Sequence, residues 1–236
     1  DPALKRMLRP SSISYGSSEA DVVWSDVEFH PGRTSFSIRS EFFGLRRVEI
    51  PLRGIHNVSN TTGALTLASA TGIDIDRAID SVSTFAGVGR RFDVIGSAGG
   101  VTFVDDYAHL PREIAAVLAA ARGEWNRTVA VFQPNRYNRM ALMSDEYADA
   151  FVDADVVVIT DIYSSGTQPI EGVTGMLVVE AIRRRHPRAV VEWVPERAEL
   201  AAAVDALVEE GDVCISMGCG DIETLPREIL ERRHGS

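Results

Sequence analysis

The stretch GVTFVDDYAHLP, residues 100–111, decides the fold. Its first five residues form an apolar, β-rich run, which predicts a strand buried inside a sheet. Pro111 suits the first turn of a helix, because its fixed φ is helical and no N–H is needed there. The expected helix would bury the apolar residues that recur at helical spacing, Ile114, Val117, Leu118 and Ala121.

The same alternation of strand and helix continues to the end of the chain. Four more apolar runs follow, at Thr128–Phe132, Asp155–Thr160, Ala189–Val194 and Asp212–Met217. Helices are expected between them, one with an apolar face of Met143, Tyr147 and Phe151, another with Leu200, Ala203, Val204, Leu207 and Val208. Continuous apolar strands joined by helices predict an α/β fold, with a Rossmann-like, doubly wound and mainly parallel sheet over residues 87–236.

Residues 1–86 follow a different pattern. Alternating runs at Asp21–Phe29, Thr34–Ser40 and Arg46–Leu52 predict an antiparallel meander, with a hairpin turn at residues 30–33. Helices are expected at Val58–Thr71, ended by Gly72, and at Asp76–Phe85. This set is small for a domain that folds alone, so it is interpreted as part of a larger α/β domain.

Composition narrows the classes of function. The net charge of -10 disfavours nucleic acid as a partner, because binding a phosphate backbone needs a basic face. Two cysteines, Cys214 and Cys219, cannot form a disulfide framework and indicate a reducing, cytoplasmic setting. No apolar run is long enough to span a membrane. The single lysine, Lys5, is not part of a G-x-x-x-x-G-K-[ST] phosphate loop, and the sequence contains no such motif.

Polar side chains gather where the predicted strands end. Residues 105–111, 133–139, 161–166 and 218–221 each follow a strand. The carboxyl ends of parallel strands meet at one edge of the sheet, which is where such folds bind ligands. Arg136 and Arg139 can grip a carboxylate or phosphate bidentately there, close to a helix N-terminus that also favours anions.

Each of these residues also has a structural interpretation. Asp105 and Asp106 could be turn or capping residues, which is the commoner role for such a pair. Arg136 and Arg139 could be a solvated helix start, and His109 a hydrogen-bonded surface histidine. Short glycine turns such as residues 218–220 are common between strand and helix, and Cys219 is interpreted as structural.

Two other segments are candidates for binding. His56, Asn57 and Asn60 lie at a strand-to-helix junction, where an amide either caps the helix or pairs with the edge of a base. Residues 87–92 join the two parts of the chain and include Arg91. They are either a flexible linker or a hinge that presents a guanidinium to a phosphate.

Taken together, these residues resemble the Mur ligases. The resemblance rests on six motifs in order: G-x-H-N-V-x-N (54–60), G-V-x-R-R-F (87–92), D-D-Y-A-H-x-P (105–111), F-Q-P-x-R-Y-x-R (132–139), P-I-x-G-V (169–173) and M-G-x-G-D-I (217–222). Within the family, the chain is most similar to the branch that joins L-alanine to UDP-N-acetylmuramate. The Tyr15-Gly16 turn is also similar to the middle of the family's central domain.

The resemblance implies a domain assignment and a reaction. Residues 1–86 would be the C-terminal half of the central ATP-binding domain, and 87–236 the C-terminal Rossmann-like domain. The UDP-sugar domain, the phosphate loop and the acidic Mg²⁺ ligands would lie in missing N-terminal domains of the same enzyme. The expected reaction is ATP-dependent amide formation through an acyl phosphate, and this chain alone is expected to be inactive.

The resemblance also implies roles for individual residues. His56, Asn57 and Asn60 would face the adenine of ATP, Arg91 its phosphates and Asp106 its ribose. Tyr107, His109, Arg136 and Arg139 would orient the amino acid and the anionic groups of the substrate. No metal ligand is expected among the residues of this chain.

Three positions depart from the family pattern. Leu110 stands where a second His is usual, Arg112 where Thr is usual, and Asn135 where His is usual. These changes leave three functions open: an active L-alanine ligase, a murein-recycling ligase that attaches a peptide to the same sugar nucleotide, or a non-catalytic Mur-like binding module. A nicotinamide dehydrogenase is excluded, because no G-x-G-x-x-G fingerprint follows a strand.

Overall fold

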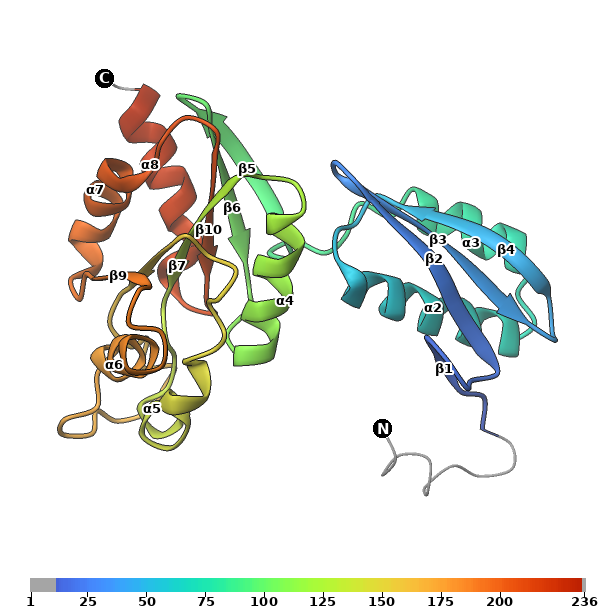
Figure 1. Ribbon diagram of the computed structural model, residues 1–236, viewed down its shortest axis with the longest axis horizontal. Helices are drawn as coiled ribbons and strands as arrows, with labels where there is room; N and C mark the ends of the chain where they lie inside the picture. The colour runs from blue at the N-terminus through green and yellow to red at the C-terminus, as the bar shows by residue number, and fades with distance from the viewer. Residues whose placement is uncertain (1–11, 235–236) are drawn as a thin grey trace. The chain divides into compact units, whose positions relative to one another are not determined.

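The chain forms two compact units, described here over residues 12–234 from a computed structural model (Figure 1). The division falls between Gly87 and Val88. The expected division at residue 86 lies one position earlier. Assignment of the first unit to half of an ATP-binding domain stays a prediction, and Lys5 lies outside the described residues. Each unit is treated separately below.

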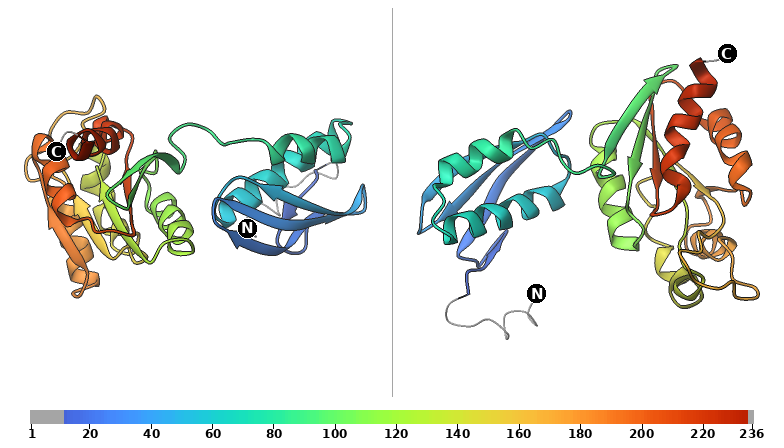
Figure 2. Two further views of the ribbon diagram at one scale, coloured as in Figure 1. Left: turned by 90° about the horizontal axis from the view of Figure 1, so that it is seen from above. Right: turned by 180° about the vertical axis from the view of Figure 1, so that it is seen from behind.

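The first unit is a four-stranded sheet with two helices on one face (Figure 2). Its strands lie in the order β1-β2-β3-β4, and the elements are β1 Tyr15–Gly16, β2 Val22–His30, β3 Arg33–Ser40, β4 Gly44–Ile50, α2 Ile55–Ala70 and α3 Ile75–Ser83. The predicted meander is confirmed, since β2, β3 and β4 pair antiparallel. His30 pairs with Arg33 across the turn, where Gly32 has the positive φ of 72° that such a hairpin requires.

Period-two alternation sorts the side chains of this sheet onto two faces. Phe36 pairs with Val48 on the face that packs against the helices, and both are fully buried with Val58 and Leu65. The other face carries charged, exposed side chains: Arg33 lies 3.5 Å from Glu49, with both side chains more than half exposed. Gly72, with φ 85°, follows the end of α2 as the sequence predicts.

The second unit is a six-stranded sheet in the order β5-β6-β10-β7-β8-β9. The strands are β5 Asp93–Ala98, β6 Val101–Asp106, β7 Arg127–Phe132, β8 Val156–Ile159, β9 Val190–Trp193 and β10 Asp212–Met217. Every neighbouring pair is parallel except β5 and β6, so the predicted doubly wound, mainly parallel sheet is confirmed.

Helices cover both faces of this sheet (Figures 1 and 2). One layer contains α4 Pro111–Arg122, α5 Tyr137–Met143, the 3-10 helix η1 Ser144–Tyr147 and α6 Met176–Arg185; the other contains α7 Arg197–Leu207, the 3-10 helix η2 Asp221–Thr224 and α8 Leu225–His234. Pro111 is the first residue of α4, as predicted. None of the helices in residues 12–234 combines the length and apolar character needed to cross a membrane.

Two details differ from the sequence prediction. Strand β5 was not predicted, because its sequence DVIGSA is short, half polar and interrupted by glycine. The single helical face through Met143, Tyr147 and Phe151 is wrong, because α5 ends at Met143 and a 3-10 turn follows. Ser144 and Asp145 begin that turn, and both are residue types that favour turns over helix interiors.

The strand order positions the site. Strand β10 lies between β6 and β7, with Met217 in register with both Asp106 and Phe132. The segments after these three strands therefore start side by side at the same level. The opposite end is structural: Arg127 pairs with the buried Asp212, which joins the starts of β7 and β10.

Candidate functional site

Arg90 is a structural clamp at the carboxyl rim of the second sheet, the edge at which the parallel strands β6, β10 and β7 end. Its Nε lies 2.8 Å from Oδ2 of Asp105, with only 23% and 4% of the two side chains exposed. Its Nη2 also donates to the carbonyl of Gly218, 2.9 Å away, and its Nη1 lies 2.9 Å from Glu223. Burial raises the pKa of Asp105, and the charge and hydrogen bond of Arg90 oppose that shift. Arg90 therefore ties the segment before β5 to the ends of β6 and β10.

Asp106 holds the loop that follows β6. Its Oδ2 accepts the N–H of Phe92 and its Oδ1 accepts the N–H of Ala108, each at 2.7 Å. The residue is 2% exposed, and burial raises the pKa of its carboxyl group while these hydrogen bonds oppose the rise. Both oxygens thus bind backbone donors of the protein, which is the capping role that the sequence left open.

Tyr107 lies beside two guanidinium groups. The Cζ of Arg90 is 5.1 Å from the centre of its ring and that of Arg91 is 5.5 Å away, within cation–π range. Arg90 is held by carboxylates, whereas Arg91 is exposed on the same rim. Of the two neighbouring arginines, Arg91 is the one presented to solvent for an anionic ligand.

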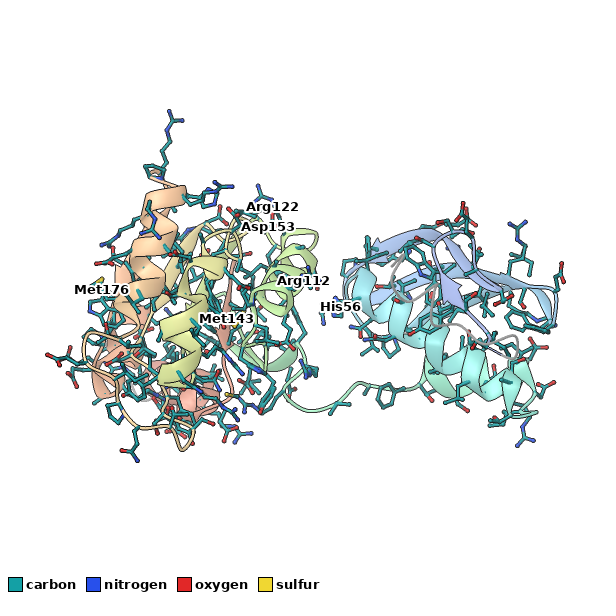
Figure 3. The ribbon with its side chains drawn as sticks, turned by 90° about the horizontal axis from the view of Figure 1, so that it is seen from below. His56, Arg112, Arg122, Met143, Asp153 and Met176 are labelled. Carbon is teal, nitrogen blue, oxygen red and sulfur yellow. The ribbon has the colours of Figure 1, made fainter. Side chains whose placement is uncertain are left out.

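His109 is held in one orientation by its own loop. Its Nδ1 lies 3.1 Å from the carbonyl oxygen of Tyr107, and the two rings pack edge to face. A carbonyl oxygen can only accept, so Nδ1 carries the proton and Nε2 of the neutral ring is an acceptor. Glu113 accepts the N–H groups of both His109 and Leu110, which fixes the start of α4. Arg112 projects from the first turn of the same helix (Figure 3).

The loop between β7 and α5 positions two arginines. Arg136 has φ 66°, a left-handed conformation that is strained for a residue with a Cβ. Its N–H donates to the carbonyl of Tyr163 at 2.9 Å, which keeps this conformation in place. Arg139, in the first turn of α5, donates from Nη1 to Oδ1 of the buried Asn135. The residue that replaces the usual His therefore orients an arginine of the site.

The turn after β10 requires glycine for packing. A Cβ on Gly220 would lie 2.4 Å from Cγ of Tyr163 and 2.5 Å from Oε1 of Gln133. Gln133 is buried and donates to Asp221 at 2.7 Å, which links the β7 loop to this turn. In the sequence, this glycine turn is only a weak indication of a site. Glycine is required at position 220 because Tyr163 and Gln133, which are distant along the chain, leave no room for a Cβ.

Cys219, at the centre of that turn, lies among positive charges. Burial raises the pKa of its thiol, while Arg139, Arg136 and Arg90 act in the opposite direction. The thiol therefore stays protonated, which agrees with its interpretation as structural. Three arginines from two segments act on this one point, Arg90 before β5 and Arg136 and Arg139 after β7, in a chain of net charge -10.

The remaining predicted residues lie in the first unit, in the first two turns of α2, where Figure 3 labels His56. Asn57 donates from Nδ2 to the carbonyl of Arg53 at 2.8 Å and lies 3.1 Å from Nε2 of His56. Asn60, one turn further, is exposed. The structure thus brings Arg91, Asp106, Tyr107, His109, Arg136 and Arg139 to one rim of the second unit and groups His56, Asn57 and Asn60 in the first.

Comparison with protein families gives one match over most of the second unit. Residues 90–220, more than half of the chain, match the family described as Mur ligase, glutamate ligase domain. The chain is 38% identical over 228 residues to the UDP-N-acetylmuramate–L-alanine ligase of Pelobacter propionicus, covering 94% of this chain and 49% of that protein. It is also 38% identical over 227 residues to the enzyme of the same name from Sorangium cellulosum, covering 93% and 48%. The chain spans about half the length of these relatives.

Solved structures show the same fold. The UDP-N-acetylmuramate–alanine ligase of Thermotoga maritima superimposes with a TM-score of 0.79 at 23% identity, covering 94% of this chain and 48% of that one. A murein peptide ligase from Psychrobacter arcticus gives a TM-score of 0.66 at 20% identity, covering 92% and 45%. At these identities, the likeness concerns the fold alone.

Proposed function

The chain belongs to the Mur ligase family, and from this we propose that it is part of an ATP-dependent ligase that joins L-alanine to UDP-N-acetylmuramate, a step of peptidoglycan precursor synthesis. Two relatives with that name, each 38% identical, support the choice of substrates. Because the chain spans about half of their length, the complete reaction belongs to a longer protein.

The observation that carries the proposal is the cationic cluster around Cys219. The guanidinium groups of Arg136 and Arg139 come from one short loop and helix and act on the same turn, beside His109 on the next segment of the rim. Two such forks suit a small carboxylate, and the orientation of Arg139 by Asn135 lowers the entropy lost on binding.

We propose that this rim binds the amino acid and leaves its amine free to react. The lactyl carboxylate of the sugar attacks the γ-phosphorus of ATP, the bond from that phosphorus to the β–γ bridging oxygen breaks, and ADP leaves as the acyl phosphate forms. The amine of L-alanine then attacks the acyl carbon, phosphate leaves with the bonding electron pair, and the nitrogen loses a proton. Arg136 and Arg139 would hold the alanine carboxylate, and Nε2 of His109 is an acceptor able to take that proton.

The donor groups for ATP fit unequally. The exposed guanidinium of Arg91 suits a phosphate, and the exposed amide of Asn60 suits the edge of adenine. Asn57 fits less well, because its Nδ2 already donates to the carbonyl of Arg53. Asp106 fits a ribose contact less well, because both its oxygens already accept backbone N–H groups. Mg²⁺, when bound with ATP, would neutralise charge on the transferred phosphoryl group.

We also propose that these 236 residues alone do not turn over ATP. They contain no G-x-x-x-x-G-K-[ST] loop, whose lysine and backbone N–H groups cradle the phosphates. Phosphate release by the purified chain with ATP, UDP-N-acetylmuramate and L-alanine should equal that of a blank. Steady release dependent on all three would refute this.

The substrate proposal can be tested on the chain itself. In NMR titrations with L-alanine, the amide signals of residues 105–111 and 133–139 should shift and saturate, and D-alanine should shift them less. A short peptide that shifts these signals in place of L-alanine would favour the peptide-recycling ligase. If neither ligand shifts them, the amino-acid site is not where we propose.

A further inference from the structure

Arg136 begins α5 in a backbone conformation that its own side chain cannot support. Its φ of 66° and ψ of 116° lie where a residue with a Cβ is strained. A residue at the N-cap position usually accepts one of the first N–H groups of the helix, but a guanidinium only donates hydrogen bonds. Other groups must therefore hold both this residue and the start of the helix.

The segment after β8 supplies those groups. The N–H of Tyr163 donates to the carbonyl of Pro134, and the carbonyl of Tyr163 accepts the N–H of Arg136, each at 2.9 Å. Oγ1 of Thr167 accepts the N–H of Tyr137 at 3.1 Å. Tyr137 is the first residue of α5, so this hydroxyl caps the helix from a segment 30 residues away. Arg136 is therefore held at its own N–H and at the N–H that follows it.

A tight turn places the hydroxyl of Thr167. The N–H of Thr167 donates to the carbonyl of Ser164 at 2.9 Å, and the two residues between them, Ser165 and Gly166, have φ of 47° and 80°. Positive φ at both central positions is typical of a type I′ turn. Oγ1 of Thr167 donates to the same carbonyl, 2.6 Å away. Its proton is thus engaged at Ser164, and the oxygen is the acceptor for Tyr137.

The segment that carries Thr167 is itself anchored. Oδ1 of Asp161 accepts the N–H groups of Ile162 and Gly175, at 2.8 and 2.9 Å. The ring of Tyr163 packs so closely on Gly220 that a Cβ there would lie 2.4 Å from its Cγ. A strained residue persists only where its surroundings are fixed in this way, because a loose segment would relax together with it.

We infer that Thr167 is a positioning residue, which holds Arg136 in its strained conformation by capping the residue that follows it. One hydrogen bond and the strain at one residue are of similar size, so loss of this bond lets Arg136 relax toward negative φ. The relaxed backbone would direct the guanidinium elsewhere. For the ligand, the inference rests on the proposed function: the group that Arg136 would hold is the carboxylate of the amino acid.

The test is Thr167→Val in the intact chain, because valine keeps the branched shape of threonine and removes the hydroxyl. The one-bond coupling between Cα and Hα of Arg136, measured by NMR, depends on the sign of φ and should change in the variant. Exchange of the Tyr137 amide proton with solvent should accelerate by about tenfold, the upper range for loss of one neutral hydrogen bond. A coupling equal to that of the unaltered protein overturns the inference.

Two matched variants show whether this hydroxyl is responsible. Thr167→Ser keeps the hydroxyl, so both readouts should match those of the unaltered protein. Thr160→Val removes a hydroxyl directly after β8, one that donates to the carbonyl of Pro195 at 3.3 Å, and it should also leave both readouts unchanged. If Thr160→Val changes the coupling as much as Thr167→Val does, the effect is a general disturbance of the segment and the inference fails.

Binding of L-alanine separates this inference from the proposed function. The dissociation constant should rise by about tenfold in Thr167→Val, because the apparent affinity falls with the fraction of molecules that present the guanidinium. It should stay unchanged in Thr167→Ser. A changed coupling in Thr167→Val, without L-alanine binding by the unaltered chain, supports the positioning role and rejects the proposed ligand.

A second pair of variants covers the case in which Thr167→Val does not fold. Thr167→Ala removes the hydroxyl without placing a methyl group where it was, and it should change the coupling of Arg136 in the same way. Glycine adopts positive φ without strain, so in the Arg136→Gly background Thr167→Ala should accelerate exchange of the Tyr137 amide less than it does alone. Equal acceleration in both backgrounds overturns the inference.

Discussion

The outer face of the first sheet and the carboxyl rim of the second use the same residue types for different purposes. On the outer face, Arg33 lies 3.5 Å from Glu49, and both side chains are more than half exposed. On the rim, Arg90 lies 2.8 Å from Asp105, with 23% and 4% of the side chains exposed. Water screens the first pair, whereas the second is largely removed from water. The burial of an arginine, more than its presence, therefore indicates its role.

The strongest test of this comparison is Arg90→Met. The substitution keeps an apolar stem but leaves the carboxylate of Asp105 buried without its cation. The free energy of unfolding of the second unit should fall by about 3–5 kcal/mol, as for other broken buried pairs. Urea unfolding can be followed through Trp125 and Trp193, which both belong to that unit.

Arg33→Met is the matched control in the first unit. Its pair with Glu49 is exposed, so the free energy of unfolding should change by no more than about 0.5 kcal/mol. Trp24, in β2 of the same sheet, reports on this unit. Equal losses for Arg33→Met and Arg90→Met would show that burial does not distinguish the two regions.

A packing variant tests the rim without changing a charge. In Gly220→Ala, the new Cβ would lie 2.4 Å from the ring of Tyr163 and must displace it. The second unit should lose about 1–3 kcal/mol, the usual effect of overpacking. Gly89→Ala is the control, since a Cβ there meets nothing within 4 Å. If both variants are equally stable, the turn after β10 does not need its glycine.

The sequence predicts most of the fold because apolar strands are read directly from local pattern. Strand β10 has the predicted bounds, Asp212–Met217, and all six of its residues are buried. Strand β5 was missed although Gly99-Gly100 precedes β6, and a Gly-Gly pair is a hairpin signal. The position of β10 between β6 and β7 could not be predicted, because strand order depends on packing between distant segments.

The sequence predicts which residues lie at the site, but not which of them hold the structure and which are free to bind a ligand. Motif and strand position indicate Tyr107, His109, Arg136 and Arg139, yet nothing local separates Arg90 from Arg91. Their partners lie far along the chain: Arg90 contacts the carbonyl of Gly218. Tyr147 was predicted only as part of an apolar face, because its hydroxyl bonds to a residue 38 positions away.

The loss of unfolding free energy caused by Arg90→Met should depend on pH, which gives a further test of the comparison. Burial already raises the pKa of Asp105, and removal of Arg90 takes away the main opposing contribution. An acid whose pKa is raised in the folded state contributes stability at low pH that is lost as pH rises through the folded-state pKa. The penalty should therefore be larger at pH 7 than near pH 4, by about 1.4 kcal/mol per unit of added shift. A penalty that grows as pH falls would contradict this.

The smallest effect on the free energy of unfolding is expected for substitution of Arg91, the residue that follows Arg90. Arg91 is exposed and contacts the ring of Tyr107 at 5.5 Å, an interaction that contributes about 0.5 kcal/mol at an exposed site. Arg91→Met should therefore leave urea unfolding almost unchanged while weakening the binding of inorganic triphosphate, measured by calorimetry. If Arg91→Met destabilises the unit as much as Arg90→Met, both arginines are structural and the phosphate role must move elsewhere. If stability and triphosphate binding are both unchanged, Arg91 neither stabilises the unit nor binds phosphate. Exposure of an arginine on this rim would then not be enough to identify a binding residue.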